Sequence, residues 1–475
     1  MVSLSNYFLF PEKIGKIQEK KMISEAKKIE LAQWLLDPDN PPSREAMAGE
    51  ADELAALEQR LQRANLSKVY QEIELPLVDV LEEMHQVGIK VDPEYLKKLS
   101  KDLDKEIVGL VKDIYKQAGG ELNLNSPKQL SAILFEKLQI SPEGIPRKKT
   151  GAYSTDAETL NLIKDRHPIV APILKYRELY KLQSTYVLPL QELTGKDGRI
   201  HTTFVQTGTG TGRLSSKEPN LQNIPTTTEW GKKIRGAFIA DKGNSLVSLD
   251  YSQIELRVLA SVAGDPAMIE AFKKGIDIHK VTASNVFNVP LEKVTPEMRS
   301  LAKTLNFGVI YGMGPNAFAQ TGNISVEEAK KFIAEYFSDF ASVKGWQEDM
   351  IRRAKKDKYV ENLNGRRRLV PGITHPNRRF SSEAERMVTN MPIQGLAADI
   401  IKLAMIKCDE LIHKKKWQNK VRLLLSIHDE LIFEVDDKIV EEVLPEIKKV
   451  MESAYKLRNV ELKVDSAVGK KWADL

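Results

Sequence analysis

The chain has 475 residues, of which 42% are hydrophobic and 29% charged, and its formal net charge at pH 7 is +5. This composition indicates a globular protein of several domains or subdomains, without the run of roughly 20 apolar residues that spans a membrane. The opening apolar stretch is too short for a secretory signal, and the lone Cys408 allows no internal disulfide, so we expect a cytoplasmic location. The small positive excess permits a polyanionic partner without demonstrating one.

The first 200 residues are predominantly helical in pattern. Residues 1 to about 65 are rich in Lys, Glu and Ala, and prolines between residues 38 and 42 separate two predicted helical stretches. The clearest helix begins at Asp92-Pro93, an N-cap followed by a proline at the first helical position, and ends at Gly119-Gly120. Its apolar residues recur at spacings of three and four and predict an amphipathic helix of about 26 residues: Leu96, Leu99, Leu103, Ile107, Leu110 and Ile114.

The character of the chain changes near residue 201. Strand-like runs at 246–250, 423–427 and 431–435 flank a large helical insert between about 265 and 380. A small sheet split by an inserted helical region, preceded by long helices, predicts an α+β multidomain fold.

Two of these hydrophobic strands run into a carboxylate, Asp250 in the first and Asp429 after the second. An unpaired carboxylate at the end of a buried strand is unfavourable unless a positive group lies beside it. Divalent metal is the candidate, because hard oxygen ligands suit Mg²⁺ and two ions can activate an attacking oxygen and stabilise a leaving one. The alternative for each residue alone is a local role, Asp250 as a helix N-cap and Asp429 in a hairpin turn.

A stripe of cations and aromatic rings lies in the segment 299–312. Arg299, Lys303, Phe307 and Tyr311 are spaced by four, so a helix presents them along one face. Two cations followed by flat rings match a nucleoside triphosphate, with charges for the phosphates and a ring for the base and sugar. The spacing alone leaves an ordinary core or solvated stripe open.

Three other features are compatible with nucleic acid. Arg386, Asn390 and Gln394 are again four apart, which suits reading of the minor groove, with a satisfied polar network as the equal alternative. The polar segment 211–225 resembles a binding loop. The basic clusters at 147–149, 352–356 and 366–368 are each weak evidence, because such runs are usually solvated faces.

Together these strings closely resemble the family A DNA polymerases, of the bacterial DNA polymerase I type, from about residue 66 to the end of the chain. The resemblance rests on four motifs in the family's order: Thr211-Gly-Arg-Leu-Ser-Ser with Pro219-Asn-Leu-Gln-Asn-Ile-Pro225, Asp250-Tyr-Ser-Gln-Ile-Glu255, Arg299-x3-Lys303-x3-Phe307-x3-Tyr311-Gly312, and His428-Asp-Glu430.

The resemblance implies a right-hand architecture with an antiparallel-sheet palm, helical fingers and a helical thumb. The thumb would comprise 66–200, the palm 201–264 with 381–475, and the fingers 265–380. Residues 1–65 would be a remnant of the 3′–5′ exonuclease-like domain without its metal motif, and the resemblance therefore predicts neither proofreading nor 5′ nuclease activity.

The resemblance also implies the roles of single residues. Asp250, Asp429 and the main-chain carbonyl of Tyr251 would hold two Mg²⁺ ions, with Mn²⁺ as a substitute, and Glu430 would have a lesser catalytic role nearby. Lys303 would act in catalysis and, with Arg299 and His279, bind the dNTP triphosphate. Gln253 would also touch the dNTP, Glu255 would exclude a ribose 2′-hydroxyl, and Phe307 and Tyr311 would line the nascent-pair pocket. The residues that hold the primer-template duplex would be Arg213, Asn220, Gln222, Asn223, Arg386, Gln394 and His428.

The expected function is therefore primer extension with dNTPs by a monomeric DNA-directed DNA polymerase, without membrane association, in a bacterial cytosol or nucleoid or in a virus-infected cell. Two departures from the family pattern, Leu396 and Ser426, are expected near the template-primer surface, where they would alter template preference or fidelity. The alternatives are a polymerase with substantial reverse-transcriptase activity and a catalytically silent DNA-binding scaffold. Intact Asp250, Asp429, Arg299 and Lys303 argue against the scaffold, and Glu255 argues against an RNA product.

Overall fold

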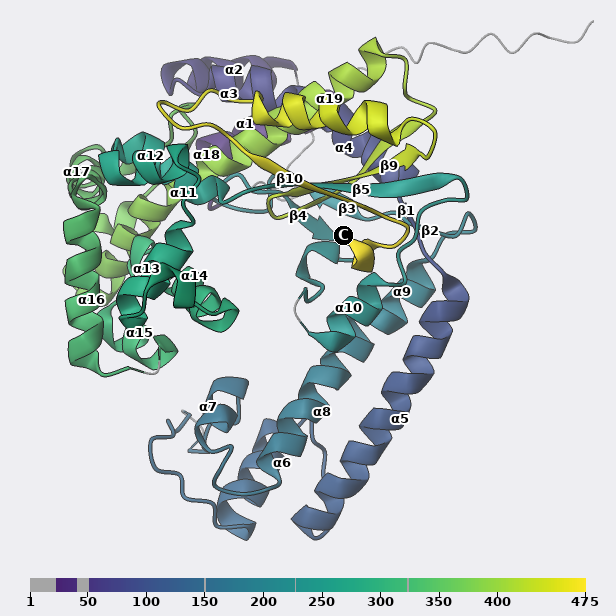
Figure 1. The fold of residues 1–475 in the computed structure, drawn as a ribbon, viewed down its shortest axis with the longest axis vertical. Coiled ribbons are helices and arrows are strands. Elements are labelled where there is room, and N and C mark those ends of the chain that lie inside the picture. The colour runs from purple at the N-terminus through teal and green to yellow at the C-terminus, as the bar shows by residue number, and fades with distance from the viewer. Residues whose placement is uncertain (1–22, 41–50, 149–150, 227, 323) are drawn as a thin grey trace, which may run out of the picture.

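The fold combines a small antiparallel sheet with many helices, as the sequence predicts (Figure 1). The computed structural model describes residues 23–40, 51–148, 151–226, 228–322 and 324–475. The sheet lies centrally, a helical group that includes α13–α16 hangs from one side, and the long helices α5 and α8 project from the other (Figure 1). The α+β prediction is confirmed.

The central sheet has the strand order β10-β5-β9-β8, and every neighbouring pair is antiparallel. Its strands are β5 (Asn244–Tyr251), β8 (Val421–Ile427), β9 (Glu430–Asp436) and β10 (Val464–Gly469). The apolar residues of β5, β8 and β9 are buried, because helices pack against the sheet. The predicted strand runs are therefore confirmed, each longer by two or three residues in total.

A helical insert separates β5 from the two C-terminal strands of the sheet. It comprises α11 (Ile254–Ala263), α12 (Pro266–Lys273), α13 (Ile278–Phe287), η6 (Leu291–Lys293), α14 (Pro296–Ile310), α15 (Pro315–Gly322), α16 (Val326–Asp339) and α17 (Ala341–Asp357). The hairpin of β6 (Tyr359–Glu361) and β7 (Arg367–Leu369), the short η7 (Pro371–Thr374) and the long α18 (Arg378–Lys414) then return the chain to the sheet. α19 (Val440–Glu452) and η8 (Trp472–Asp474) flank β10.

The predicted long helix is α5 (Pro93–Ala118), with the bounds that its capping residues indicate. The Asp92 carboxylate accepts hydrogen bonds from the backbone N–H groups of Glu94 and Tyr95 at 3.1 and 3.0 Å, and Gly119 ends the helix at φ 68°. α5 packs along α8 (Val170–Leu182), η4 (Gln183–Val187) and α9 (Leu188–Leu193). At the far end of the pair lie α6 (Pro127–Ser131), η3 (Ala132–Lys137) and α7 (Ala157–Leu162), around an apolar cluster of their own.

The N-terminal helices form a separate apolar cluster that adjoins α4 and α18. α1 (Glu25–Leu36) packs on α2 (Ala51–Arg63), and α3 (Ser67–Val69), η2 (Tyr70–Glu74) and α4 (Leu75–Val87) follow. Trp34 is fully buried among Leu31, Leu61 and Tyr70. Of the residues discussed from the sequence, Lys149 and the prolines at 41 and 42 lie outside the described ranges.

The remaining elements connect these parts. β1 (Ile89–Lys90) pairs with β2 (Arg199–Ile200), and β3 (Thr203–Val205) pairs with β4 (Ser215–Lys217). η5 (Leu221–Asn223) and α10 (Glu229–Arg235) lead from β4 into β5. The polar segment 211–225 that the sequence singled out comprises the end of the β3–β4 loop, β4, η5 and the residues that follow η5.

Candidate functional site

The two carboxylate strings meet because β5 and β9 pair in the sheet. Asp250 on β5 lies opposite Glu430 on β9 and opposite Asp465 on β10. The Tyr251 N–H donates to the carbonyl of Asp429 at 3.1 Å, so the main chains of the two strings touch. Asp429 occupies the β8–β9 turn after His428, whose φ is 53°. The hairpin placement of Asp429 is thus confirmed, whereas the N-cap of α11 is Gln253 and not Asp250.

The carboxylates carry an excess of negative charge. Burial raises the pKa of Asp250 to about 6, and the charges of Glu430 and Asp465 add to the shift. Burial raises the pKa of Asp429 to about 7, with a further contribution from Glu255, while Arg213 and Lys303 act in the opposite direction. Burial also raises the pKa of Glu430, although the Ser248 hydroxyl donates a hydrogen bond to it. A cation at this position would relieve the repulsion.

The donor set fits a hard divalent cation. Asp250 and Asp429 offer carboxylate oxygens, and Tyr251, the residue after Asp250, has a main-chain carbonyl of the same hard type. The surrounding protein raises the pKa of Asp250, but its side chain still reaches solvent, so a cation has access to it. The donor atoms of Glu83, Asp409 and His413, on α4 and α18, form a different group within 4.8 Å of one another. That group carries a ring nitrogen and is a different kind of site from the two aspartates.

The cation–aromatic stripe lies on α14 as predicted. Arg299, Lys303 and Phe307 are on the helix, and Tyr311 follows as its C-cap, with the Phe307 and Tyr311 rings stacked at 6.1 Å between centroids. Arg299 forms an ion pair with Asp277, the N-cap of α13. Lys303 is exposed, and its charge lowers the pKa of both Asp250 and Asp429, so it faces the carboxylates.

His279 is held as a neutral ring behind this stripe. Its side chain is 1% exposed and packs on Phe307 at 5.8 Å between ring centroids. Asn306 Nδ2 donates to His279 Nδ1 at 2.9 Å, which leaves the ring proton on Nε2, and Asn306 Oδ1 accepts from the Thr282 hydroxyl at 2.8 Å. Burial lowers the pKa of His279 to about 4. Its Nε2 is buried without a hydrogen-bond partner among the described residues.

Glu255 joins the two halves of the site. It lies in the first turn of α11, is buried, and accepts hydrogen bonds from Arg213 and from the Tyr311 hydroxyl. Burial and the charge of Glu255 raise the pKa of Tyr311, so its hydroxyl keeps its proton and donates. Arg213 of the segment 211–225 and Tyr311 of the cation–aromatic stripe therefore hold the Glu255 carboxylate between them.

The residues of η5 that are expected to hold a duplex are fixed by hydrogen bonds to their own segment, to β8 and to η4. The Asn220 side chain caps η5 through the Gln222 N–H at 3.1 Å, and Gln222 Nε2 donates to the carbonyl of Ser426 on β8 at 3.0 Å. The Asn223 carbonyl accepts from the Tyr186 hydroxyl at 2.6 Å. His428 is exposed.

The predicted stripe on α18 also reaches this region. Arg386 is exposed and packs against Gly312, where a Cβ would lie 2.9 Å from Arg386 Cγ. The Gln394 side chain makes a hydrogen bond with Tyr311.

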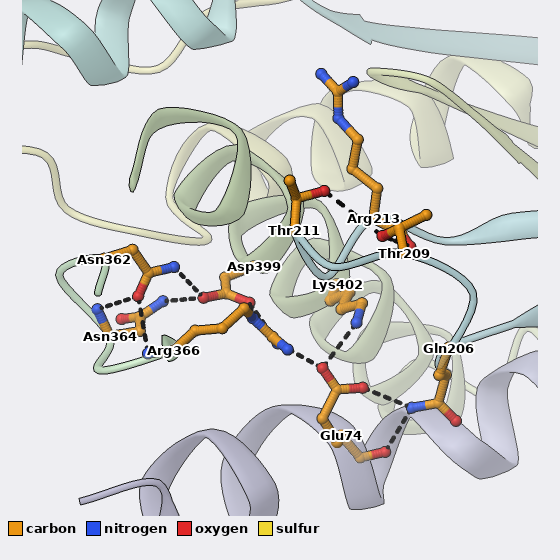
Figure 2. A network of polar contacts seen from close by, with 10 residues as sticks. All are labelled: Glu74, Gln206, Thr209, Thr211, Arg213, Asn362, Asn364, Arg366, Asp399 and Lys402. Carbon is orange, nitrogen blue, oxygen red and sulfur yellow. Dashed lines mark hydrogen bonds and ion pairs between the residues drawn. The ribbon is translucent and has the colours of Figure 1, made fainter. Parts of the chain in front are cut away.

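Leu396 and Ser426 are 0% and 2% exposed, so their side chains pack in the core, while the Ser426 carbonyl accepts a hydrogen bond from Gln222. An effect of these two residues on template preference or fidelity stays a prediction. One expectation from the sequence is wrong. The run 366–368 is not a solvated face. Arg366 is buried in a polar network, Arg367 pairs with Glu361 and Arg368 with Asp39 (Figure 2 shows the network).

Two features were not apparent in the sequence. Arg235 of α10 lies over the Trp472 ring at 4.2 Å and, with Asp250 and Glu430, lines a cavity of about 380 Å³. The buried network around Arg366 joins residues from four separate segments, and no spacing rule connects them. Cys408, in contrast, is buried as expected, and burial raises the pKa of its thiol.

Within the described ranges, the helices are too short or too polar to span a bilayer. The comparisons with known proteins agree on one family. The model of DNA polymerase family A matches residues 93–474. The chain is 45% identical over 459 residues to a thermostable DNA polymerase I of Thermus aquaticus, covering 93% of this chain and 54% of that protein.

It is 44% identical over 443 residues to DNA polymerase I of Geobacillus stearothermophilus, covering 92% of this chain and 50% of the relative. The chain thus spans about half the length of these curated relatives. The polymerase domain of Pol1 from M. smegmatis, solved in complex with DNA primer-template and dNTP, superposes with a TM-score of 0.88 at 38% identity, over 94% of this chain and 82% of that one. The chain therefore belongs to DNA polymerase family A.

Proposed function

We propose that this chain is a DNA-directed DNA polymerase that extends a primer 3′-hydroxyl with dNTPs. The observation that carries the proposal is the approach of Asp250 on β5 to Asp429 in the β8–β9 turn, with Lys303 of α14 near enough for its charge to lower the pKa of both carboxyls. The M. smegmatis domain, similar in fold, was solved with primer-template and dNTP, which supports the same ligands here.

Asp250, Asp429 and the Tyr251 carbonyl would hold two Mg²⁺ ions, or Mn²⁺ in their place, which supply the positive charge that lowers the pKa of the attacking hydroxyl and stabilises the leaving pyrophosphate. Lys303 and Arg299 bring cations to the triphosphate, where charge develops as the bond to the α-phosphorus breaks. Asp277 restrains Arg299 until a phosphate competes for its guanidinium. Glu430 keeps the site negative from beside Asp250.

The nucleotide would stack on Phe307, with Tyr311 behind it and Gln253 at its edge. The buried His279 Nε2–H has no hydrogen-bond acceptor in the part of the chain that the structure describes, and it would reach the triphosphate only after α13 and α14 move. Such a movement fits closure of a fingers helix around a correct pair.

Glu255 would choose the sugar. Because Arg213 and Tyr311 hold its carboxylate from two sides, Glu255 cannot swing away to admit a ribose 2′-hydroxyl. A fixed obstacle discriminates better than a mobile one, since relaxation of the side chain would otherwise absorb the clash.

The duplex would be held by donors that suit the degenerate minor groove: Arg213, Asn220, Gln222, Asn223, Arg386, Gln394 and His428. We further propose 66–200 as thumb, 201–264 with 381–475 as palm, 265–380 as fingers and 1–65 as a part related to the exonuclease-like domain. We propose that the polymerase acts as a monomer in the cytoplasm and does not trim a mismatched primer end. The residues before 66 contain no Asp-x-Glu metal motif.

The test is primer extension with Mg²⁺ on matched DNA and RNA templates, with dNTPs or rNTPs offered separately. We expect extension on DNA with dNTPs and no trimming of a 3′-mismatched primer. Asp429→Ala should abolish extension while duplex binding, measured by fluorescence anisotropy, persists. A folded wild-type protein that binds primer-template without extending it would refute the proposal, and extension by Asp429→Ala would refute the metal assignment.

A further inference from the structure

The loop that ends at Arg213 cannot hold its own shape. Between β3 and β4 it reads Gln206-Thr-Gly-Thr-Gly-Thr-Gly-Arg213, and three glycines in eight residues make its backbone unusually free. Its internal hydrogen bonds are few and partly long: Thr209 Oγ1 donates to the Arg213 carbonyl at 2.9 Å, the Gly212 N–H donates to the Thr209 carbonyl at 3.4 Å, and the Thr209 and Thr211 hydroxyls lie 3.5 Å apart. Arg213 nevertheless needs a defined position, because its guanidinium forms an ion pair with Glu255.

A buried ionic cluster lies directly beneath this loop (Figure 2). It consists of Glu74, Arg366, Asp399 and Lys402, with two charges of each sign, and each residue is at most 2% exposed. Lys402 Nζ donates to Glu74 at 2.7 Å, Arg366 Nε to Asp399 at 2.8 Å, and Arg366 also reaches Glu74. Apolar residues would commonly fill such a space with no loss of stability, so stability alone does not explain the cluster.

The cluster touches both ends of the loop. At the first end, Gln206 Nε2 donates to the Glu74 carbonyl at 2.9 Å and to its carboxylate at 2.8 Å. At the other end Gly212, with φ 89°, lies so close to Arg366 that a Cβ would be 2.7 Å from Nε. In Figure 2 the Arg213 guanidinium points away from the cluster, so the cluster fixes the loop and leaves the arginine free.

The N-terminal residues 24–40 hold the middle of the same loop. The Thr207 hydroxyl donates to Glu30 on α1 at 2.9 Å. Asp39 pairs with Arg368 at 2.8 Å, and a Cβ on Gly210 would lie 2.7 Å from Asp39 Oδ1. Trp34 covers the cluster, with the Arg366 and Lys402 charges each 5.3 Å from its ring.

We infer that residues 24–40 and the buried ionic cluster are a positioning device for the loop 206–213, and that they set the place of Arg213 relative to Glu255 and the duplex. The part of the inference that concerns the duplex rests on the proposed function, because it expects a displaced Arg213 to weaken primer-template binding. The residues of the device act through Arg213 and need not touch substrate. Residues 24–40 then contribute to the polymerase site by positioning one of its loops.

The first test needs no catalysis. Asp39→Ala removes an accessible contact to the loop, and Gln206→Met cuts the bond to Glu74 without changing a charge. Glu361→Ala is the matched control, because Glu361 pairs with the neighbouring Arg367 of the same hairpin at 2.9 Å. Hydrogen exchange followed by mass spectrometry should show the amides of 207–213 exchanging about 5-fold faster in both variants and unchanged in the control. Unchanged exchange in both variants would overturn the inference.

The second test is kinetic. In Asp39→Ala and Gln206→Met we expect the KM for primer-template to rise about 5-fold with kcat nearly unchanged, and no further rise when Arg213→Ala is already present. Asp39→Asn, which keeps the side-chain shape, replaces Asp39→Ala if the latter melts early. A KM equal to that of wild type, or a full additional effect in the Arg213→Ala background, would overturn the positioning role. Failure of the wild type to extend primers would refute the proposed function. Hydrogen exchange would still test whether residues 24–40 and the ionic cluster position the loop 206–213.

Discussion

Asp250 on β5 lies directly opposite Glu430 on β9, and the charge of Glu430 helps to raise the pKa of Asp250 to about 6. The neighbouring negative charge therefore favours the protonated form of Asp250, and a bound cation would favour the ionised form. This arrangement makes cation binding strongly dependent on pH, since a ligand carboxyl must lose its proton to bind.

Mg²⁺ affinity should consequently fall as the pH is lowered. With the pKa of Asp250 at about 6 and that of Asp429 at about 7, both groups are charged at pH 8 and mostly protonated below pH 6. We expect affinity at pH 6 to be about 20-fold weaker than at pH 8, with proton release on binding. Calorimetric titration with Mg²⁺ or Mn²⁺ in buffers of different ionisation enthalpy measures both quantities. In Asp429→Asn the dependence above pH 6.5 should disappear, and an affinity independent of pH in the wild type would contradict the prediction.

If Glu255 has the proposed role, removal of its carboxylate should relax the choice between dNTPs and rNTPs. Glu255→Ala opens the space that the clamped carboxylate fills, so we expect incorporation of rNTPs relative to dNTPs to rise on the order of 10- to 100-fold. Tyr311→Phe keeps the ring and removes only one of the two hydrogen bonds to Glu255, so its effect should be smaller. The ratio of kcat/KM for the two sugars is the measurement. Equal effects of the two substitutions would argue against the clamp.

His279 should not titrate near neutral pH. Because burial lowers its pKa to about 4, the ring stays neutral from pH 5.5 upward, and any donation from Nε2 is constant over that range. We expect His279→Gln to raise the KM for dNTP without changing how that KM varies between pH 5.5 and 9. The histidine ring signals in NMR provide a second check. A ring signal of His279 that titrates between pH 6 and 7 would contradict the burial argument.

The contribution of the buried ionic cluster to the free energy of unfolding should depend on a balance of positive and negative charges within it. Lys402→Met leaves Glu74 with Arg366 and without its lysine, and loss of one partner of a fully buried pair costs about 3–5 kcal/mol of unfolding free energy. The double variant with Glu74→Gln should recover much of that loss. Urea unfolding at pH 7.5 measures both, and a double variant no more stable than Lys402→Met would contradict the ionic explanation.

Acid should weaken the same cluster. Burial by itself would raise the pKa of Glu74, but Lys402 and Arg366 lower it below its ordinary value. A carboxyl whose folded pKa is depressed contributes stability above its unfolded pKa and loses it as the pH falls through the folded value. We therefore expect this contribution to be constant above about pH 4.5 and to vanish only below it. In the Glu74→Gln variant the acid-dependent part of the unfolding free energy should be smaller.

Local signals predicted much of the fold. The Asp92-Pro93 start and the Gly119 stop bound α5 correctly, because capping groups act on backbone atoms a few residues away. The apolar runs around Asp250 and Asp429 became strands of one sheet, and the spacing of four placed Arg299, Lys303 and Phe307 on one face of α14. Each of these predictions depends on geometry within one element.

The failures involve residues that pack across elements. The run 366–368 has the pattern of a solvated face, yet Arg366 is buried because Glu74 and Asp399, from distant segments, neutralise it there. Leu396, two residues after Gln394, is buried in the core, and its position in the sequence does not indicate this burial. No periodicity distinguishes these cases, because a side chain's partner in another segment is not encoded in its own spacing.

The sequence by itself determined which carboxylates, cations and rings this polymerase family member carries, and on which strands and helices they stand, because those properties follow from residue type and short-range spacing. Only the tertiary structure decided that Arg213 and Tyr311 clamp Glu255, and that an N-terminal helix and four buried charges support the loop behind Arg213. These contacts join residues that are up to hundreds of positions apart in the sequence, so short-range spacing does not predict them. Burial also changes the role of a charge: a solvated Arg366 would be an ordinary surface cation, whereas the buried Arg366 is held in place by its acidic partners.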